Sequence, residues 1–293
     1  MNMPPNILGR VYPYLNFKLK NQFLWDSYYN KLPEPKLKNR ITSTPEVTNE
    51  IIAELKKNNF TIKDYQIDVD DYKQYLKKAN YQQFPYHKGG RSKNFPEKSL
   101  EHYLGAKLLE LSGDDVYVDI ANGDSPTPEI YNALYGCDTY SQDLVYPQGV
   151  HEKIIGGDAC NLPLADSFFT KIGLHCSFEH FEHNADIVFI KEANRVLRHR
   201  GRLCILPLYL FNEYAIQTNP VCVPNSFSFE RNATLYCVKQ WQVHYSRFYD
   251  VPHLVERVRN NLEQLDMTIY VIKNEKDVDE SCYVKYAAVF EKT

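Results

Sequence analysis

Residues 115–133 constrain this chain most, because an apolar run, a turn of small residues and a helical pattern follow one another there. Val116 to Ile120 is apolar and β-branched, with one acid, Asp119, near its end. Ala121 to Ser125 is the turn, and apolar residues at helical spacing follow it. Strand, turn and helix in this order predict half of a βαβ unit, whose turn lies where small ligands bind in open α/β sheets. An ordinary connection between a strand and a helix would give the same local pattern.

The alternation of strands and helices continues downstream. Short apolar runs near residues 137–142, 153–157, 170–174 and 203–206 predict four more strands, and residues 185–197 predict an amphipathic helix before the last of them. Alternating β and α elements indicate a mainly parallel sheet that is covered by helices on both faces.

Two acidic residues end the strands that follow the first turn. Asp143 lies 22 residues beyond Ala121, and in nucleotide-binding α/β folds an acid at about this distance accepts hydrogen bonds from a ribose diol. Asp158 and Ala159 end the next strand, where a carboxylate and free backbone groups can recognise an adenine ring. Each acid could also be an ordinary residue at the end of a strand.

Five segments in this order resemble the successive motifs of class I S-adenosylmethionine-dependent methyltransferases, with small-molecule methyltransferases the nearest in character. They are VDIANG, YSQDL, GGDACNLPLADSFF, SFEHF and EANRVLRHRGRLCILP, within about Leu100 to Pro207. The resemblance implies a Rossmann-like, seven-stranded, mostly parallel sheet with helices on both faces, and residues 268–273 and 282–290 would form its antiparallel edge. Ala121 and Ser125 depart from the pattern, because they stand where the family has its first and third glycines.

The resemblance also implies S-adenosylmethionine as the cofactor. The residues expected to bind it lie in the first turn and at the ends of the neighbouring strands: Asp119, Ala121, Asn122, Gly123, Asp143, Leu144, Asp158, Ala159, His175 and Ser177. In such enzymes the cofactor supplies the activated methyl group, while the protein supplies alignment and electrostatics.

A hydroxyl acceptor would also need a base. His180, just beyond the fourth strand, is the first candidate, with Glu179 beside it, and Tyr209 after the fifth strand is a further candidate. His180 could equally be a helix cap or a core residue. No pattern of Cys, His, Asp or Glu predicts a metal site.

Residues 1–95 are expected to form a helical extension before a methyltransferase domain at 96–293. A capping box at Ser43 to Glu46 and an apolar stripe predict one of its helices, and residues 70–79 predict another. A loop with Gly89 and Gly90 follows, and its aromatic and cationic residues are candidates for substrate binding: Tyr86, His87, Lys88 and Arg91. A solvated connector is the alternative for this loop.

Residues 209–250 hold many aromatic side chains and are expected to form an insertion or lid over the acceptor site. An amphipathic helix with Leu254, Leu262 and Leu265 follows. Together with abundant tyrosine and the basic extension, these aromatics favour a sugar or a glycan-pathway metabolite as the acceptor.

The seven scattered cysteines form no CxxC pair, and the first ten residues have no signal-peptide pattern. We therefore expect a cytoplasmic protein without a membrane span, and the absence of a basic aromatic stripe argues against nucleic acid as a partner. The sequence does not predict an oligomeric state. Two other functions are weighed: a protein that binds the cofactor without turnover, and a nicotinamide-dependent oxidoreductase, against which the missing GxGxxG motif counts.

Overall fold

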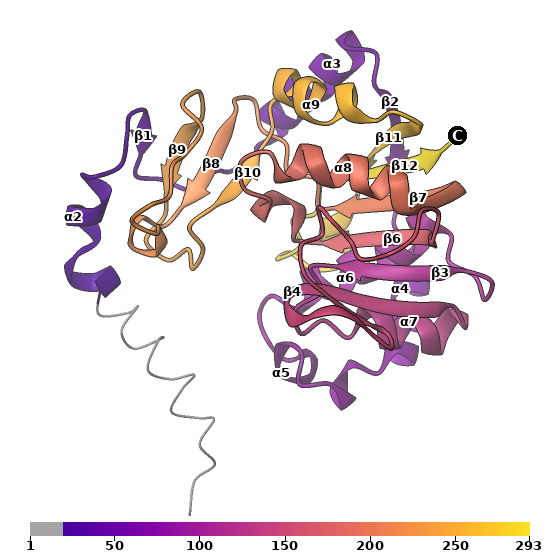
Figure 1. The fold of residues 1–293 in the computed structure, drawn as a ribbon. Helices are drawn as coiled ribbons and strands as arrows, with labels where there is room; N and C mark the ends of the chain where they lie inside the picture. The colour runs from indigo at the N-terminus through magenta and orange to yellow at the C-terminus, as the bar shows by residue number, and fades with distance from the viewer. Residues whose placement is uncertain (1–19) are drawn as a thin grey trace, which may run out of the picture. The chain divides into compact units, whose positions relative to one another are not determined.

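The computed structural model describes residues 20–293, and the chain divides into two compact units (Figure 1). The larger unit comprises residues 52–210 and 251–293, and among the described residues the smaller one comprises 20–51 and 211–250. This division differs from the expected boundary after residue 95, because residues 52–95 belong to the larger unit. The amino-terminal stretch used to argue against a signal peptide lies outside the described residues.

The larger unit is built on an eight-stranded sheet in the order β2-β11-β12-β7-β6-β3-β4-β5, and the predicted Rossmann-like fold is confirmed. Strand β12 runs antiparallel to both of its neighbours, and the other strand pairs are parallel, except that residues 148–151 of β4 pair with β5 in the reverse direction. The bounds of the strands are β2 Thr61–Tyr65, β3 Val116–Ile120, β4 Asp138–His151, β5 Ile154–Gly156, β6 Phe169–His175, β7 Leu197–Leu206, β11 Leu265–Ile272 and β12 Tyr286–Lys292.

Two details of the predicted sheet were wrong. The sheet has eight strands instead of seven, because β2, from the segment expected to be only helical, pairs with β11 in parallel. The antiparallel strand β12 is therefore an interior strand between β11 and β7, not part of the edge. A free edge strand presents unpaired backbone groups, and β2 satisfies those of β11.

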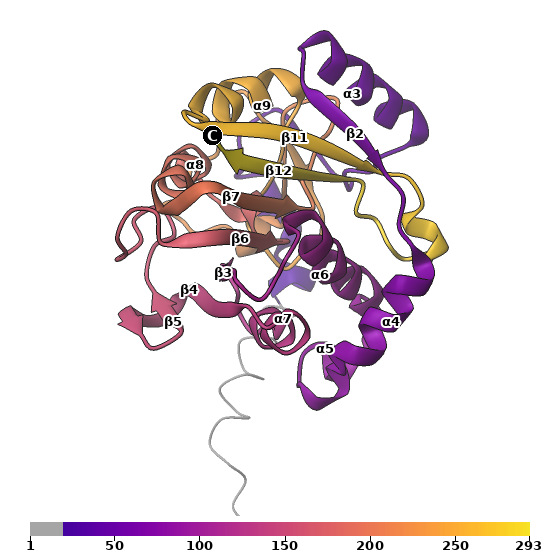
Figure 2. The same ribbon diagram turned by 90° about the vertical axis from the view of Figure 1, so that its right-hand side faces the viewer.

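Helices cover both faces of this sheet (Figure 2). On one face lie α6 (Phe95–Leu109), α7 (Thr127–Tyr135) and α4 (Val69–Ala79), and on the other lie α8 (Ala185–Val196) and α9 (Val251–Arg257). Four short 3₁₀ helices in this unit are η1 Tyr81–Gln83, η2 Phe178–His180, η4 Arg259–Asn261 and η5 Glu275–Asp277. The helix expected to run to Leu265 ends earlier, since Leu265 already pairs with Lys292 in the sheet.

Helix α6 positions part of the site described below. Leu109 near its end accepts a hydrogen bond from Lys171 Nζ at the beginning of β6. Gly105 faces the other end of β6, where a β-carbon on this glycine would lie 2.5 Å from His175 Nε2. The helix thus runs antiparallel to β6, and its amino-terminal half reaches the edge at which the parallel strands end.

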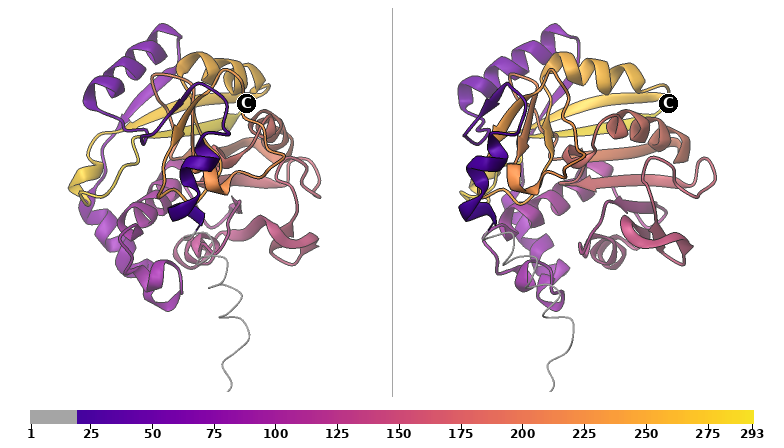
Figure 3. Two further views of the ribbon diagram at one scale, coloured as in Figure 1. Left: turned by 90° about the vertical axis from the view of Figure 1, so that its left-hand side faces the viewer. Right: turned by 60° about the vertical axis from the view of Figure 1, so that its left-hand side comes forward.

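The smaller unit contains a four-stranded sheet in the order β1-β9-β8-β10 (Figure 3). Its strands are β1 Lys36–Leu37, β9 Thr234–Cys237, β8 Ala215–Thr218 and β10 Ser246–Phe248, and α2 (Trp25–Tyr29) and η3 (Pro220–Cys222) belong to the same unit. Helix α3 (Pro45–Lys57) spans the boundary between the units. Its amino terminus is capped by Thr44, whose Oγ1 accepts from Val47 N at 3.3 Å, and not by Ser43 as the capping box predicted.

The insertion at 209–250 therefore contributes strands of its own to a sheet that also takes in Lys36 and Leu37. The core of this small sheet includes Ile41, Phe211, Ala215 and Tyr236. Across residues 20–293, no helix has both the length and the apolar character needed to cross a membrane.

Candidate active site

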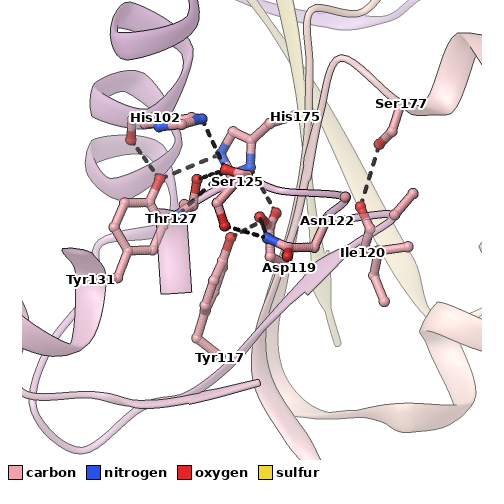
Figure 4. Close-up of polar contacts among 12 residues, drawn as sticks. His102, Tyr117, Asp119, Ile120, Asn122, Ser125, Thr127, Tyr131, His175 and Ser177 are labelled. Atoms are coloured by element: carbon pink, nitrogen blue, oxygen red, sulfur yellow. Dashed lines mark hydrogen bonds and ion pairs between the residues drawn. The ribbon is translucent and has the colours of Figure 1, made fainter. Parts of the chain in front are cut away.

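Asp119, at the end of β3, is the centre of a buried hydrogen-bond network (Figure 4). Its side chain is almost completely buried, and Oδ1 accepts from His175 Nδ1 at 2.9 Å and from the Tyr117 hydroxyl at 3.2 Å. Oδ2 accepts from Asn122 Nδ2 at 2.7 Å. One carboxylate thus ties together the end of β3, the following turn and the end of β6.

The turn after β3 has two residues in the left-handed backbone region, Ala121 at φ +52° and Gly123 at φ +58°. This conformation is unfavourable for a residue with a β-carbon, so Ala121 is held by its surroundings, including a hydrogen bond from its N–H to Gln142 Oε1 at 3.2 Å. No atom lies within 4 Å of the position that a β-carbon on Gly123 would take. The outer side of the turn is therefore open at Gly123.

Asp143 connects β4 to this turn. Its Oδ2 accepts from Gly123 N at 2.8 Å and its Oδ1 accepts from Val145 N at 3.0 Å. The side chain is only partly buried, so each oxygen retains a lone pair for a ligand. The Tyr146 hydroxyl approaches Gly123 O at 2.8 Å and Asn122 Oδ1 at 2.9 Å, and burial raises the pKa of Tyr146 to about 12.

Asp158 lies near Asp143, because Asp143 is in β4 and Asp158 comes just after the neighbouring strand β5. Asp143 pairs with Gly156 in the sheet, and Gly157 N donates to Asp143 O at 3.2 Å. The Asp158 side chain is exposed and accepts from Cys160 N at 2.9 Å, whereas Ala159 is buried. Leu144, another predicted cofactor residue, is 73% exposed.

Gln142 was missed by sequence reasoning. It is 1% exposed, and its Nε2 donates to Gly157 O at 2.6 Å while its Oε1 accepts from Ala121 N. Gln142 thus connects the turn at Ala121 with the loop at Gly157. The only sequence signal for this role was a polar residue directly before Asp143.

His175 and Ser177 lie at the end of β6, next to the turn. His175 Nε2 is 3.3 Å from the Tyr131 hydroxyl, and Ser177 Oγ donates to Ile120 O at 3.4 Å. Two further residues of this network, His102 on α6 and Tyr131 on α7, were not predicted (Figure 4). His102 Nε2 lies 3.3 Å from Ser125 Oγ, and burial lowers the pKa of His102 well below its usual value, so its ring is neutral.

Two of the predicted catalytic residues lie in a second cluster, beyond the ends of β6 and β7. Cys176 Sγ is 3.2 Å from Glu179 Oε1 and 3.5 Å from the Tyr209 hydroxyl. His180, the first candidate base, is on the outer side of this cluster with Nε2 3.5 Å from Glu179 Oε1. Burial raises the pKa of Cys176 well above its usual value, so the thiol stays protonated and is a poor nucleophile.

Helix α6 adds charged residues to this second cluster. The sequence predicted the helix but no functional role for these residues. Lys98 Nζ lies 2.6 Å from Glu101 Oε1, and Glu101 is completely buried. Glu97 is also buried and accepts from Tyr283 N at 2.7 Å. These residues are far from Glu179 in the sequence, so no sequence pattern indicated that they lie near one another. We refer to Glu97, Lys98, Glu101, Cys176, Glu179 and Tyr209 as the carboxylate cluster.

The predicted substrate-binding residues divide into two pairs. The Tyr86 ring stacks on His102 with centroids 5.5 Å apart, and His87 Nδ1 lies 2.6 Å from Ser92 Oγ. Lys88 and Arg91 are exposed, and Arg91 Nε donates to Lys88 O at 3.0 Å. The segment expected as a loop contains a short helix, α5 (His87–Gly90), with Lys88 and Gly89 in the left-handed region.

Replacing Glu97 by Gln is expected to flatten the pH dependence of stability. Burial, assisted by repulsion from Glu101, raises the pKa of Glu97 to about 8 from 4.5. Because the folded state holds this proton more tightly, its contribution is complete below pH 4.5 and is lost as the pH rises through 8. The variant should lose less stability between pH 5 and 8 than the wild type, by about 3–4 kcal/mol.

Urea unfolding followed by far-UV circular dichroism at several pH values measures this difference. Glu256→Gln, an exposed residue on α9, is the matched control and should follow the wild-type profile. Identical slopes for Glu97→Gln and the wild type would contradict the assignment of a buried, protonated Glu97.

The site has the chemistry that an adenosyl cofactor requires. An open turn surface at Gly123, a partly exposed carboxylate at Asp143 and backbone groups near Ala159 lie at neighbouring strand ends. Among residues 20–293 no three His, Cys, Asp or Glu side chains are grouped so that they could hold a metal ion.

Comparison with known proteins agrees with this reading of the fold. Residues 119–205, from the end of β3 into β7, match the family described as "Methyltransferase domain". No curated protein sequence matches the chain.

Similar solved structures include three proteins at low sequence identity. The 1,6-didemethyltoxoflavin-N1-methyltransferase of Burkholderia thailandensis, with S-adenosylhomocysteine bound, is 11% identical, with 87% of this chain and 93% of that chain covered and a TM-score of 0.45. The YcgJ protein of Bacillus subtilis is 15% identical, with 58% and 70% covered and a TM-score of 0.40. A geranyl diphosphate methyltransferase in complex with sinefungin is 10% identical, with 66% and 77% covered and a TM-score of 0.41.

The matched segment lies within the larger unit and contains the turn, both strand-end acids and the end of β6. This segment is a methyltransferase domain, and the chain that carries it is accordingly a methyltransferase.

Proposed function

We propose that this enzyme transfers the methyl group of S-adenosylmethionine to a small-molecule acceptor at the edge of the sheet where β3, β6 and β7 end, beside Asp143 of β4. The observation that carries the proposal is the hydrogen bond from Gly123 N to Asp143, which fixes a partly exposed carboxylate beside an open turn. The cofactor supplies an activated methyl group, and the chain's own residues bind, orient and move protons.

The cofactor would be held by residues of the turn and the strand ends. Asp143 would accept hydrogen bonds from the ribose diol, and Asp158 with the backbone of Ala159 would bind the adenine, with Leu144 covering it. Asn122 and Gly123 would face the methionine part, with Ala121 shaping the turn. Asp119 acts indirectly by orienting Asn122 and His175 through the contacts of its two oxygens. Ser177 holds the end of β6 against β3.

The acceptor would lie against the carboxylate cluster and the aromatic side chains near it. Glu179 and Tyr209 are the proposed proton-handling residues, with His180 beside them, and Tyr86 and His87 would contact the acceptor. Lys88 and Arg91 would bind an anionic group on its outer side. A sugar or glycan-pathway metabolite remains our proposed acceptor class, because tyrosine rings suit sugar faces. A cytoplasmic setting and the lid role of residues 209–250 also stay predictions.

Asp143→Ala is expected to weaken S-adenosylhomocysteine binding by about 150- to 20,000-fold. Each hydrogen bond from a hydroxyl to a carboxylate contributes about 1.5–3 kcal/mol, and two are lost. Isothermal titration calorimetry with purified protein gives the affinity directly, and a radiometric or mass-spectrometric screen with S-adenosylmethionine then tests turnover.

The matched control is Asp138→Ala, at the first residue of the same strand, where the carboxylate pairs with Lys153 at the surface. It should leave the affinity within about twofold. Equal losses in the two variants would place the ribose elsewhere. Tight binding with no methyl transfer to any acceptor would favour the binding protein without turnover.

A further inference from the structure

The carboxylate cluster contains more buried carboxylate oxygens than hydrogen-bond donors to pair with them. Glu97, Glu101 and Glu179 are 1%, 0% and 5% exposed. Each has one carboxylate oxygen without a hydrogen-bond partner, and within residues 20–293 these are three of six such buried side-chain atoms. Buried polar atoms in folded proteins are nearly always paired, so this concentration in one place indicates that the cluster is built for a donor.

A proton shared between Glu97 and Glu101 would satisfy the unpaired oxygens of these two residues. Glu97 and Glu101 interact directly through their carboxyl groups, and burial raises their pKa values to about 8 and about 7. Two carboxyl groups attract each other only when a proton lies between them. The pair therefore carries one negative charge near neutral pH, which Lys98 balances at 2.6 Å.

Glu179 keeps one carboxylate oxygen for which the cluster supplies no donor. Its Oε2 has no partner, and its Oε1 is near only a protonated thiol at 3.2 Å and His180 Nε2 at the long distance of 3.5 Å. A carboxylate that is 95% buried is strongly unfavourable unless a donor, best of all a cation, joins its free oxygen.

Some members and neighbours of the cluster are accessible to solvent. Cys176 and Tyr209 are partly exposed, and the nearby Tyr283 is 44% exposed. Lys98 lies over the Tyr283 ring at 5.8 Å, so the phenol ring borders the cluster. The described residues offer no three-ligand metal site, and a single buried carboxylate with aromatic neighbours suits an organic ammonium group better than a metal ion.

We propose that the acceptor is an amine, amino sugars included, whose ammonium group is bound by Glu179 Oε2. This rests on the proposed methyl transfer and names the nucleophile. The ammonium gives one proton to Glu179, and the freed nitrogen lone pair forms the bond to the sulfonium methyl carbon. The electron pair of the broken carbon–sulfur bond goes to sulfur, and the product leaves as a methylated ammonium while Glu179 returns its proton to water.

The cofactor's methionine part also carries an ammonium group. The experiment therefore distinguishes binding of the acceptor's ammonium group by Glu179 from binding of the cofactor's. The protein is saturated with S-adenosylhomocysteine and titrated calorimetrically with two matched pairs, benzylamine against benzyl alcohol and glucosamine against glucose. At least one amine should bind about tenfold or more tightly than its neutral partner. Glu179→Gln keeps the shape of the side chain and removes its charge, and it should abolish this preference while leaving the S-adenosylhomocysteine affinity within about twofold.

Glu256→Gln makes the same change at an exposed residue of α9 and should keep the preference. Three results would overturn the inference: neither amine exceeds its neutral partner, the preference survives in Glu179→Gln, or Glu179→Gln loses S-adenosylhomocysteine affinity, which would assign the cluster to the cofactor. Failure of the proposed function is a different result, because the wild-type protein would then not bind S-adenosylhomocysteine. Unfolding curves of each variant confirm that it is folded.

Discussion

Asp119→Ala should lower the free energy of unfolding by about 3–5 kcal/mol and weaken S-adenosylhomocysteine binding by more than about 100-fold. The carboxylate is 1% exposed and accepts hydrogen bonds from Tyr117, Asn122 and His175. Alanine leaves these donors buried with fewer partners and removes the charge that they solvate. The turn would then lose the contact that holds Asn122, so both stability and cofactor binding should fall together.

Urea unfolding followed by far-UV circular dichroism measures the first effect and calorimetry the second. Asp114→Ala is the control, because Asp114 is exposed two residues before the same strand begins. Asp119→Asn separates charge from packing, since it keeps the volume, and should have a smaller effect on stability. Wild-type stability in Asp119→Ala would mean that the network contributes little to holding β3 and β6 together.

Arg247→Ala should destabilise the smaller unit by about 3–5 kcal/mol. The Arg247 side chain is completely buried, and its guanidinium pairs with Glu230 at 2.8 Å and donates to Tyr214 Oη at 3.1 Å. Removing one member of a buried ion pair leaves the other charge uncompensated, and truncation also opens a cavity in a small core.

The chain's two tryptophans make this effect measurable in isolation. Trp25 and Trp241 both belong to the smaller unit, so tryptophan fluorescence during urea unfolding reports on that unit alone. Arg231→Ala, at an exposed residue of the same insertion, should leave the fluorescence midpoint unchanged. An unchanged midpoint in Arg247→Ala would show that the buried arginine does not stabilise this sheet.

The parts of the site that the sequence predicted are those whose signal is local. The run from Val116 to Ile120 forms β3 as expected, and Asp143 and Asp158 belong to adjacent strands of the sheet. The predicted end of the strand before Asp143 was wrong, because β4 continues to His151. The extra strand β2 escaped prediction because most of its side chains are exposed, which removes the alternation that identifies a half-buried strand. The insertion's strands were likewise hidden, since each has at most four residues.

The order of the elements, the turn after β3 and the acids at the strand ends were determined by sequence alone, because apolar periodicity and turn chemistry act between neighbours in the chain. Only the tertiary structure decided that Glu97 and Glu101 on α6 meet Glu179 beyond β6, and that Lys36 pairs beside Leu235 in a separate small sheet. In the sequence, Glu97 and Glu101 look like the solvated face of a helix. They became buried because Gly105 lets α6 pack closely on the end of β6, a contact between residues about 70 positions apart that no local pattern encodes.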